Sequence, residues 1–218
     1  SFNMDNNLNK QTLSNIARRL NFSTPCSGLL KLPSLIYVTD DVRVPDPLPD
    51  IAELPVGSGV LFRHYGAKNR RMLALVAKDL CDRNSLSLIV ASDYCLARDL
   101  DADGYHLPEY LALNPPFSVH LWQKRPRKFI TAAAHSLRTL QVCRKIGVDA
   151  ALLSPVFPTT SHIEQNAMGI LRFTNLCRQS TLPIYALGGI NASNAARLLK
   201  SNAIGIAAIS GISDNGHS

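Results

Sequence analysis

The sequence predicts an α/β fold, a (β/α)8 TIM barrel with an extra N-terminal helix and a short C-terminal end. Two observations support this prediction. Eight short apolar runs alternate with helix-type stretches from about residue 35 onward, and each run is nearly continuous, as in strands covered on both faces. The 218 residues are also enough for one large domain. An open doubly wound sheet is the alternative, which periodicity alone does not exclude.

The predicted strands share a length of five to seven residues and a bias toward branched and aromatic side chains. They are LIYVT (35–39), GVLFR (59–63), SLIVA (87–91), DGYHL (103–107), KFITA (128–132), AALLS (ending at 154), PIYAL (183–187) and AIGIAAI (203–209).

The clearest helical stretches between these strands are residues 68–83, 136–147 and 192–202, and residues 9–22 predict a helix before the first strand. Pro115 and Pro116 leave room for only a short helix between the fourth and fifth strands. We expect a single domain over residues 1–218, with the N-terminal helix and lead-in at 1–34 and the barrel at 35–212.

Composition is ordinary for a globular protein, with 46% hydrophobic and 18% charged residues. No apolar run approaches the roughly 20 residues needed to cross a bilayer, and no signal peptide is visible. We therefore expect no membrane partner and a cytoplasmic location.

The five cysteines are scattered without a C-x-x-C pair, which favours reduced thiols over disulfides or zinc. We expect Cys95 to be buried. They are Cys26, Cys81, Cys95, Cys143 and Cys177.

The formal net charge of +7 suits a small anionic partner such as a phosphate. The densest basic stretch, QKRPRKF, is short and interrupted by Pro126, so we interpret residues 124–128 as a solvated loop and expect no nucleic-acid partner. DLDADG (99–104) copies the start of an EF-hand loop, but its twelfth position is Tyr110 and a strand follows, which argues against calcium.

Two small-residue strand exits predict a phosphate site. Gly188 and Gly189 follow the seventh strand, and Asn191 is placed to cap the next helix. Ile209 and Ser210 end the eighth strand. In barrels the loops after strands seven and eight often hold a phosphate on backbone N–H groups.

Several segments, in order, resemble the thiamine-phosphate synthase/TenI superfamily: IYVTD, DADGYHLPE, AAAHSL, LLSPVFPTTSH, ALGGI and AAISGI. The similarity runs from about Ile36 to Ile212, and the family fold is a (β/α)8 barrel. The synthase branch joins hydroxymethylpyrimidine diphosphate to thiazole phosphate with Mg²⁺. The TenI branch aromatises a thiazole phosphate tautomer by proton transfer, without a metal.

The resemblance implies that the phosphate half of the family site is retained. It comprises Thr159 and Ser161 after strand six, Gly188 and Gly189, and Ile209 and Ser210, with Arg63 as a further anion contact or a rim salt bridge. His162 stands where the synthase has a lysine, so that cation is lost, although His162 stays a candidate phosphate-binding residue.

The diphosphate and metal half is largely missing. Ala91-Ser92 stands where the synthase has an Asn-Asp pair, and Leu111 where it has its second metal aspartate. Asp93 and Glu109 are the remaining carboxylates that a divergent synthase would use. No cofactor is therefore expected, and Mg²⁺ only if synthase activity is retained.

His135 aligns with the acid/base histidine of TenI-type tautomerases, although synthases also have it and a structural role is the alternative. Ala133 replaces a family serine. We interpret His106 as a core or rim histidine, and His64 as lining the pocket or packing at the rim.

These residues favour a TenI-like thiazole tautomerase. The alternatives are a divergent thiamine-phosphate synthase and a non-catalytic regulatory module. The expected partner is a phosphorylated thiazole or thiamine phosphate, and the resemblance also implies a homo-oligomer.

Overall fold

The computed structural model describes residues 2–23, 32–159 and 166–209. Its strands are β1 (Leu35–Val38), β2 (Gly59–Phe62), β3 (Ser87–Ala91), β4 (Gly104–Leu107), β5 (Phe129–Ala134), β6 (Ala150–Leu153), β7 (Ile184–Leu187) and β8 (Gly205–Ala208). Its helices are α1 (Phe2–Ser23), α2 (Leu48–Ala52), α3 (Arg70–Arg83), α4 (Tyr94–Asp99), α5 (Glu109–Leu113), α6 (Phe117–Gln123), α7 (Leu137–Lys145), α8 (Gly169–Gln179) and the 3-10 helix η2 (Ala195–Lys200).

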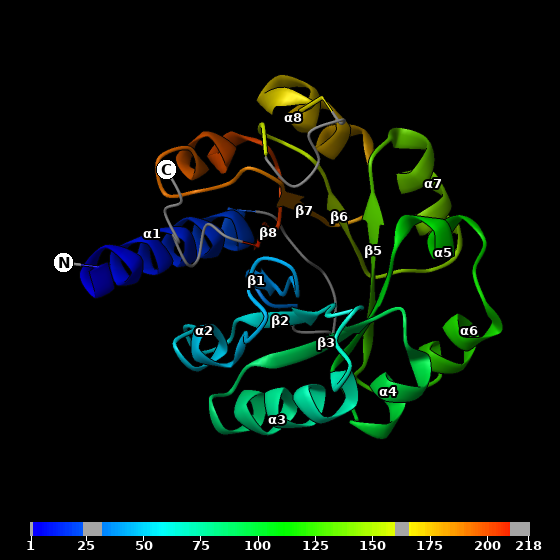
Figure 1. Cartoon of the computed structure of the whole chain (residues 1–218). Coiled ribbons are helices and arrows are strands. Elements are labelled where there is room, and N and C mark those ends of the chain that lie inside the picture. The colour runs from blue at the N-terminus through cyan, green and yellow to red at the C-terminus, as the bar shows by residue number, and fades with distance from the viewer. Residues whose placement is uncertain (1, 24–31, 160–165, 210–218) are drawn as a thin grey trace.

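The eight strands form a closed parallel barrel in sequence order, β8 pairing with β1 through Leu35 and Ile206 (Figure 1). The predicted barrel is confirmed, and the open doubly wound sheet is wrong. Each predicted strand agrees with the observed one to within two residues at either end.

The continuous apolar runs have a simple cause, since each strand contributes side chains to two cores. One core fills the barrel interior and includes Ile36, Leu61 and Leu152. The other lies between the barrel and the helices. There the fully buried Trp122 donates its ring N–H to the Phe129 carbonyl at 3.0 Å. Since both faces of a strand lose water, no polar alternation is left in the sequence.

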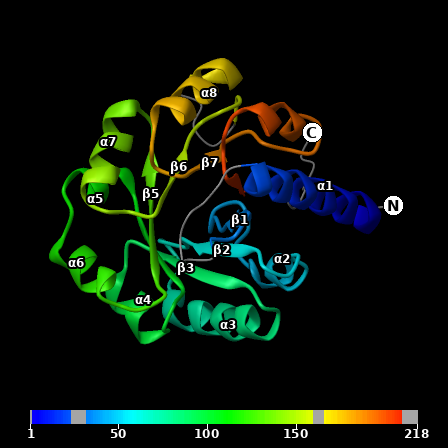
Figure 2. The same ribbon diagram turned by 180° about the vertical axis from the view of Figure 1, so that it is seen from behind.

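Helix α1 completes the helical ring between η2 and α2, beside β1 and β8 (Figures 1 and 2). Its buried residues Leu13, Ile16 and Leu20 follow a helical spacing. The nearly fully buried Lys10 reaches α2, where its ammonium lies 2.6 Å from the Glu53 carboxylate. The N-terminal helix therefore covers the seam where the barrel closes.

Two helical predictions need correction. The segment between β4 and β5 holds two short helices, α5 and α6, and Pro116 precedes the second. The helix predicted over 192–202 is wrong in type and length, because it is a 3-10 helix of six residues. The Asn191 side chain accepts the N–H groups of Ser193 and Asn194, so a turn replaces the first helical residues.

The basic loop 124–128 lies at the amino ends of the strands, because it directly precedes β5. Asp101, before β4, pairs with Arg125 at 2.7 Å and with Lys128 at 3.0 Å. Asp103 accepts the backbone N–H of Leu88 instead of facing a calcium loop. The carboxylates of the DLDADG segment thus have structural partners, which agrees with the rejection of an EF-hand.

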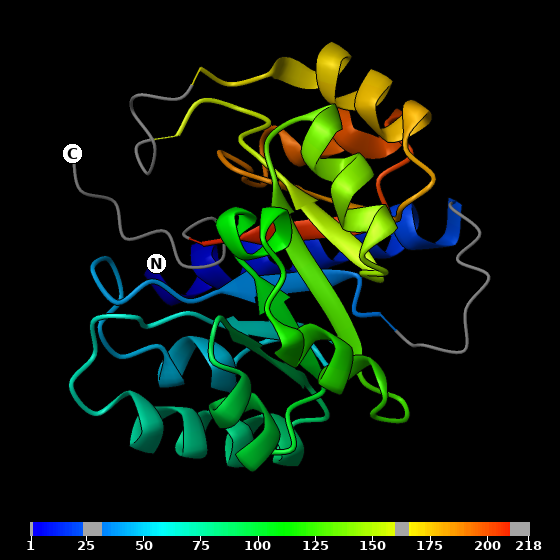
Figure 3. The same cartoon turned by 90° about the vertical axis from the view of Figure 1, so that its right-hand side faces the viewer.

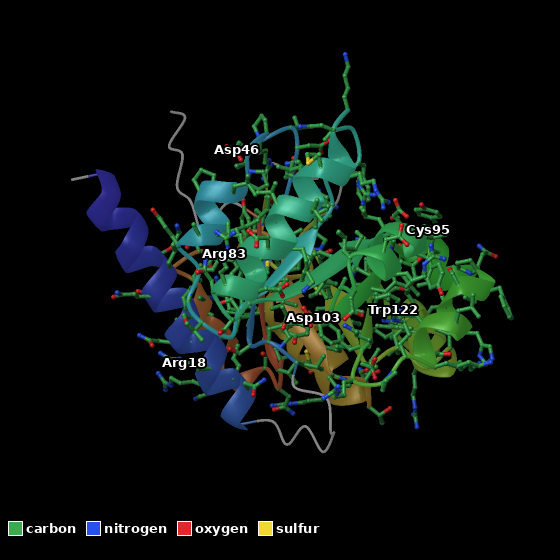
Figure 4. All side chains as sticks on the ribbon, turned by 90° about the horizontal axis from the view of Figure 1, so that it is seen from below. Arg18, Asp46, Arg83, Cys95, Asp103 and Trp122 are labelled. Carbon is green, nitrogen blue, oxygen red and sulfur yellow. The ribbon has the colours of Figure 1, made fainter. Side chains whose placement is uncertain are left out.

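Cys95 is exposed at the periphery of the molecule on α4, so the expectation that it is buried is wrong (Figure 4). It is the second residue of a six-residue helix whose inner face presents Leu96 and Ala97. Cys81, Cys143 and Cys177 are buried and free, and Cys26 lies outside the described residues.

In the described part of the chain, no helix has both the length and the apolarity to cross a membrane.

Candidate active site at the carboxyl ends of the strands

The residues that the sequence singles out for chemistry gather at one end of the barrel, because all strands are parallel and each residue follows a strand. Arg63 follows β2, Asp93 β3, Glu109 β4, His135 β5 and Gly188 β7. Seen from the side, the segments after β1 and β2 extend beyond the barrel in the same direction (Figure 3).

Glu109 and His135 are in direct contact. Nδ1 of His135 lies 2.9 Å from Oε2 of Glu109, and the His135 backbone N–H donates to Oε1 at 3.2 Å. The contact follows from the pairing of β4 with β5, which places the residues after these strands side by side. The side chains are 31% and 30% exposed, so the pair is in part accessible to solvent.

Two further side chains hold Glu109. The Thr139 hydroxyl donates to Oε1 of Glu109 at 2.6 Å, and Ser136 caps α7 by accepting the Thr139 backbone N–H at 3.2 Å. Burial alone would raise the pKa of Glu109, but the hydrogen bonds from Thr139 and His135 outweigh it and lower the pKa. The carboxylate is therefore ionised at neutral pH. Sequence reasoning missed Thr139, whose spacing from Ser136 in a helix start was the available signal.

His106 and His64 are buried. Nδ1 of His106 lies 2.9 Å from the Thr131 hydroxyl inside the barrel, which confirms the core interpretation. Burial, and secondarily the charge of Arg63, lowers the pKa of His106 to about 3. His64 contacts the Thr39 hydroxyl at 2.9 Å and stacks on Phe62, so it packs beneath the rim and does not line the mouth.

Arg63 bridges the rim. Its guanidinium lies 3.3 Å from the Asp40 carboxylate, and its backbone N–H donates to the Thr39 hydroxyl at 2.9 Å. The predicted salt bridge is therefore present. The Nε atom of Arg63 is nevertheless buried without a hydrogen-bond partner in the described part of the chain. An unpaired buried donor is costly. The Arg63 side chain as a whole is 28% exposed, so its charge can still act on an anion at this end of the barrel.

Arg70, which sequence reasoning missed, covers the exits of β2 and β3. It donates to the carbonyls of Arg63 at 3.1 Å and Ala91 at 2.9 Å, and to the Asp93 carboxylate at 3.0 Å. Asp93 also caps α4 by accepting the Leu96 N–H at 2.9 Å. Arg70 was detectable only as the first basic residue of a helix after a strand, a weak signal.

The described carboxylates do not fit a magnesium site. Asp40 bonds Arg63 and two backbone N–H groups, Asp93 bonds Arg70 and a helix start, and Glu109 bonds His135 and Thr139. Within the described ranges, no group of three or more His, Cys, Asp or Glu residues could hold a metal ion. Mg²⁺ needs hard oxygen ligands that are free to coordinate, and here each carboxylate already accepts internal donors.

The two glycines after β7 are packed closely against another segment of the same chain, the segment that follows β6. Gly188 and Gly189 have φ of 98° and 65°. A Cβ at Gly188 would lie 2.8 Å from Cα of Pro155, and one at Gly189 would lie 2.7 Å from the Phe157 carbonyl oxygen. The segment after β6 therefore packs on these glycines. Among the described residues, neither glycine donates a backbone hydrogen bond to another residue, so both N–H groups can serve a ligand.

The start of η2 offers fewer free backbone N–H groups for an anion than the sequence predicts. Asn191 takes the N–H groups of Ser193 and Asn194, and Asn194 in turn donates to the Gly189 carbonyl at 2.7 Å. The expected capping role of Asn191 is therefore wrong, because the N-cap of η2 is Asn194 and Asn191 instead holds the turn that precedes the helix. The N–H groups of Ser193 and Asn194 are therefore bonded within the chain and do not face an anion.

The remaining predicted phosphate ligands are only partly described. Ile209 is half-buried and packs against the barrel interior, so it can contribute its backbone alone. Thr159 follows the segment that packs on the glycine pair, on the same side as Gly189. Ser161, His162 and Ser210 lie outside the described residues.

Comparison with known proteins identifies close relatives along most of the chain. A family model described as thiamine monophosphate synthase matches residues 36–212. The thiamine-phosphate synthase of Coprothermobacter proteolyticus is 31% identical, over 81% of this chain and 86% of that protein. The thiamine-phosphate synthase of Bacillus cereus is 29% identical, over 77% and 79%. A solved thiamine phosphate pyrophosphorylase from Pyrococcus furiosus superposes with a TM-score of 0.66 at 25% identity, covering 83% of this chain and 86% of that one.

Proposed function

The chain belongs to the thiamine monophosphate synthase family, and from this premise we propose that it binds a phosphorylated thiazole and catalyses proton transfer on the thiazole ring. The substrate would lie in the barrel mouth, at the carboxyl ends of the strands, where barrel enzymes hold their active sites.

The observation that carries the proposal is the Glu109–His135 pair. A tautomerisation removes a proton from one carbon and delivers a proton to another, while a double bond shifts and no other group is lost. One imidazole can do both steps, accepting the first proton and delivering the second, if it is held in place. The contact with Glu109 at 2.9 Å holds His135 there.

The phosphate of this substrate would bind to the backbone N–H groups of Gly188 and Gly189, with Thr159 beside them. The Arg63 side chain, which is 28% exposed, would supply a further positive charge to the anion. The positive net charge of the chain adds a favourable long-range potential.

Thiamine-phosphate synthase activity is the second candidate, and the names of the relatives favour it. It would join hydroxymethylpyrimidine diphosphate to thiazole phosphate and release diphosphate. Against it stand the carboxylates of the mouth, each of which has an internal partner.

Two parallel assays test the proposal. Wild-type protein should convert the thiazole phosphate tautomer to its aromatic form in EDTA, and His135→Asn should lower kcat about 10²- to 10⁴-fold, the usual contribution of general acid–base catalysis. His120→Asn, at an exposed residue of α6, is the matched control and should retain full activity.

The second assay supplies hydroxymethylpyrimidine diphosphate, thiazole phosphate and Mg²⁺. Thiamine phosphate formation that EDTA abolishes, with no tautomer turnover, would replace the proposal by the synthase. Tight binding of thiamine phosphate without turnover in either assay would instead indicate a regulatory module.

A further inference from the structure

Three histidines near the carboxyl ends of the strands use Nδ1 in the same way but with different partners. His64 and His106 contact the hydroxyls of Thr39 and Thr131, each at 2.9 Å, and both rings are buried. His135 contacts a carboxylate at the same distance and is 31% exposed. The partner and the exposure together distinguish His135 from the other two.

The hydrogen-bond partners of His64 determine which of its ring nitrogens carries the proton. Its Nε2 lies 3.2 Å from the Pro45 carbonyl, which can only accept, so Nε2 carries the hydrogen. Nδ1 of the neutral ring then has no hydrogen and accepts one from the Thr39 hydroxyl, which itself accepts the Arg63 N–H. Neutral His64 is thus the Nε2–H tautomer.

The partner of His135 requires the other tautomer. An ionised carboxylate can only accept, so the hydrogen between His135 and Glu109 belongs to Nδ1. We propose that Glu109 is a positioning residue that holds neutral His135 as its Nδ1–H tautomer and leaves Nε2 as the proton-accepting atom. This inference rests on the proposed function of His135 but concerns a property of the protein without substrate.

Thr139 extends the arrangement into α7. Its hydroxyl hydrogen goes to Oε1 of Glu109 at 2.6 Å, so the Ser136 hydroxyl, 3.1 Å away, donates to Thr139. Oε1 also accepts the His135 backbone N–H. Glu109 is therefore fixed by a helix start and by the chain that carries His135, and its second oxygen is left for the ring.

The test is ¹⁵N NMR of protein labelled at histidine, without substrate. In wild type above pH 7, the His135 ring should show a pyrrole-type Nδ1 and a pyridine-type Nε2, and His64 the reverse. His135→Asn assigns the signal by its loss. Glu109→Gln should move the His135 nitrogens toward the averaged shifts of a mixed tautomer, because an amide can either donate or accept, and should leave those of His64 unchanged.

Activity provides a second measurement. Glu109→Gln should lower kcat for the tautomer about 10- to 100-fold with KM nearly unchanged, a part of the full acid–base contribution. Thr139→Val should have a smaller effect in the same direction, and Thr139→Ser, which keeps the hydroxyl, should restore wild-type shifts and rate.

The outcomes separate the two proposals. A pyrrole-type Nε2 on His135 in wild type, or an unchanged ring in a folded Glu109→Gln variant, would overturn the positioning role. The expected tautomer together with no turnover would support the positioning role and reject the proposed function.

Discussion

A Cβ atom placed on Gly188 would lie 2.8 Å from Cα of Pro155, because the segment after β6 packs directly on the exit of β7. We predict that Gly188→Ala is more destabilising than Gly57→Ala. Gly57 has a similar φ of 81°, and an added Cβ there would have nothing within 4 Å. Gly57→Ala should therefore lose only the free energy of placing alanine in a left-handed backbone, about 1–2 kcal/mol. The clash at Gly188 should add about 1–3 kcal/mol. Urea unfolding of both variants measures the difference, and equal losses would contradict the packing.

His106 should make the protein sensitive to acid. Its folded pKa of about 3 lies below the ordinary 6.5, so between these values only the unfolded chain takes up the proton. Stability is complete above pH 6.5 and falls by at most about 1.4 kcal/mol per unit as pH drops toward 3. His106→Gln should reduce this slope in urea titrations at several pH values. The exposed His120→Gln should keep it, and two identical slopes would refute the explanation.

Among the described cysteines, Cys95 should react first with a thiol reagent. It is exposed, whereas burial raises the pKa of Cys81 to about 12 and that of Cys143 to about 11. Mass spectrometry of native protein after brief alkylation should find Cys95 modified before these two, and Cys95→Ser should remove that peptide's label. Labelling of Cys81 at the same rate would show that α3 opens in the native state.

Asp93 should behave as a structural residue. Asp93→Ala removes the cap of α4 and the contact with Arg70, and should cost about 1–2 kcal/mol in urea unfolding. Asp93→Asn keeps a good capping acceptor and should remain closer to wild type. If Asp93 bound a catalytic metal, both variants would lose metal-dependent thiamine phosphate formation equally while differing in stability.

The sequence predicted the barrel because strands buried on both faces leave continuous apolar runs, and SLIVA matches β3 exactly in its bounds. The 3-10 helix η2 was not predictable in the same way. Its type depends on the Asn191 side chain competing for N–H groups that a regular helix would use, a choice between two local hydrogen-bond patterns.

The site was predictable in its residues more than in its contacts. His135 and Glu109 were both identified, but Glu109 was considered only as a metal carboxylate of a divergent synthase and was not linked to the histidine 26 residues away. Their proximity depends on the register of β4 with β5, which the sequence does not specify. Arg70 was missed because its role comes from two carbonyls and one carboxylate that approach only in the folded barrel.

The position of α1 bears on the order in which the chain can fold during translation. This helix leaves the ribosome before every strand, yet its neighbours η2 and β8 are synthesised after all the other elements of the barrel. Its apolar residues Leu13, Ile16 and Leu20 therefore have no complete surface to cover until β8 has emerged. For this interval the apolar face of α1 stays exposed to solvent, and its docking on β8 and η2 completes the barrel.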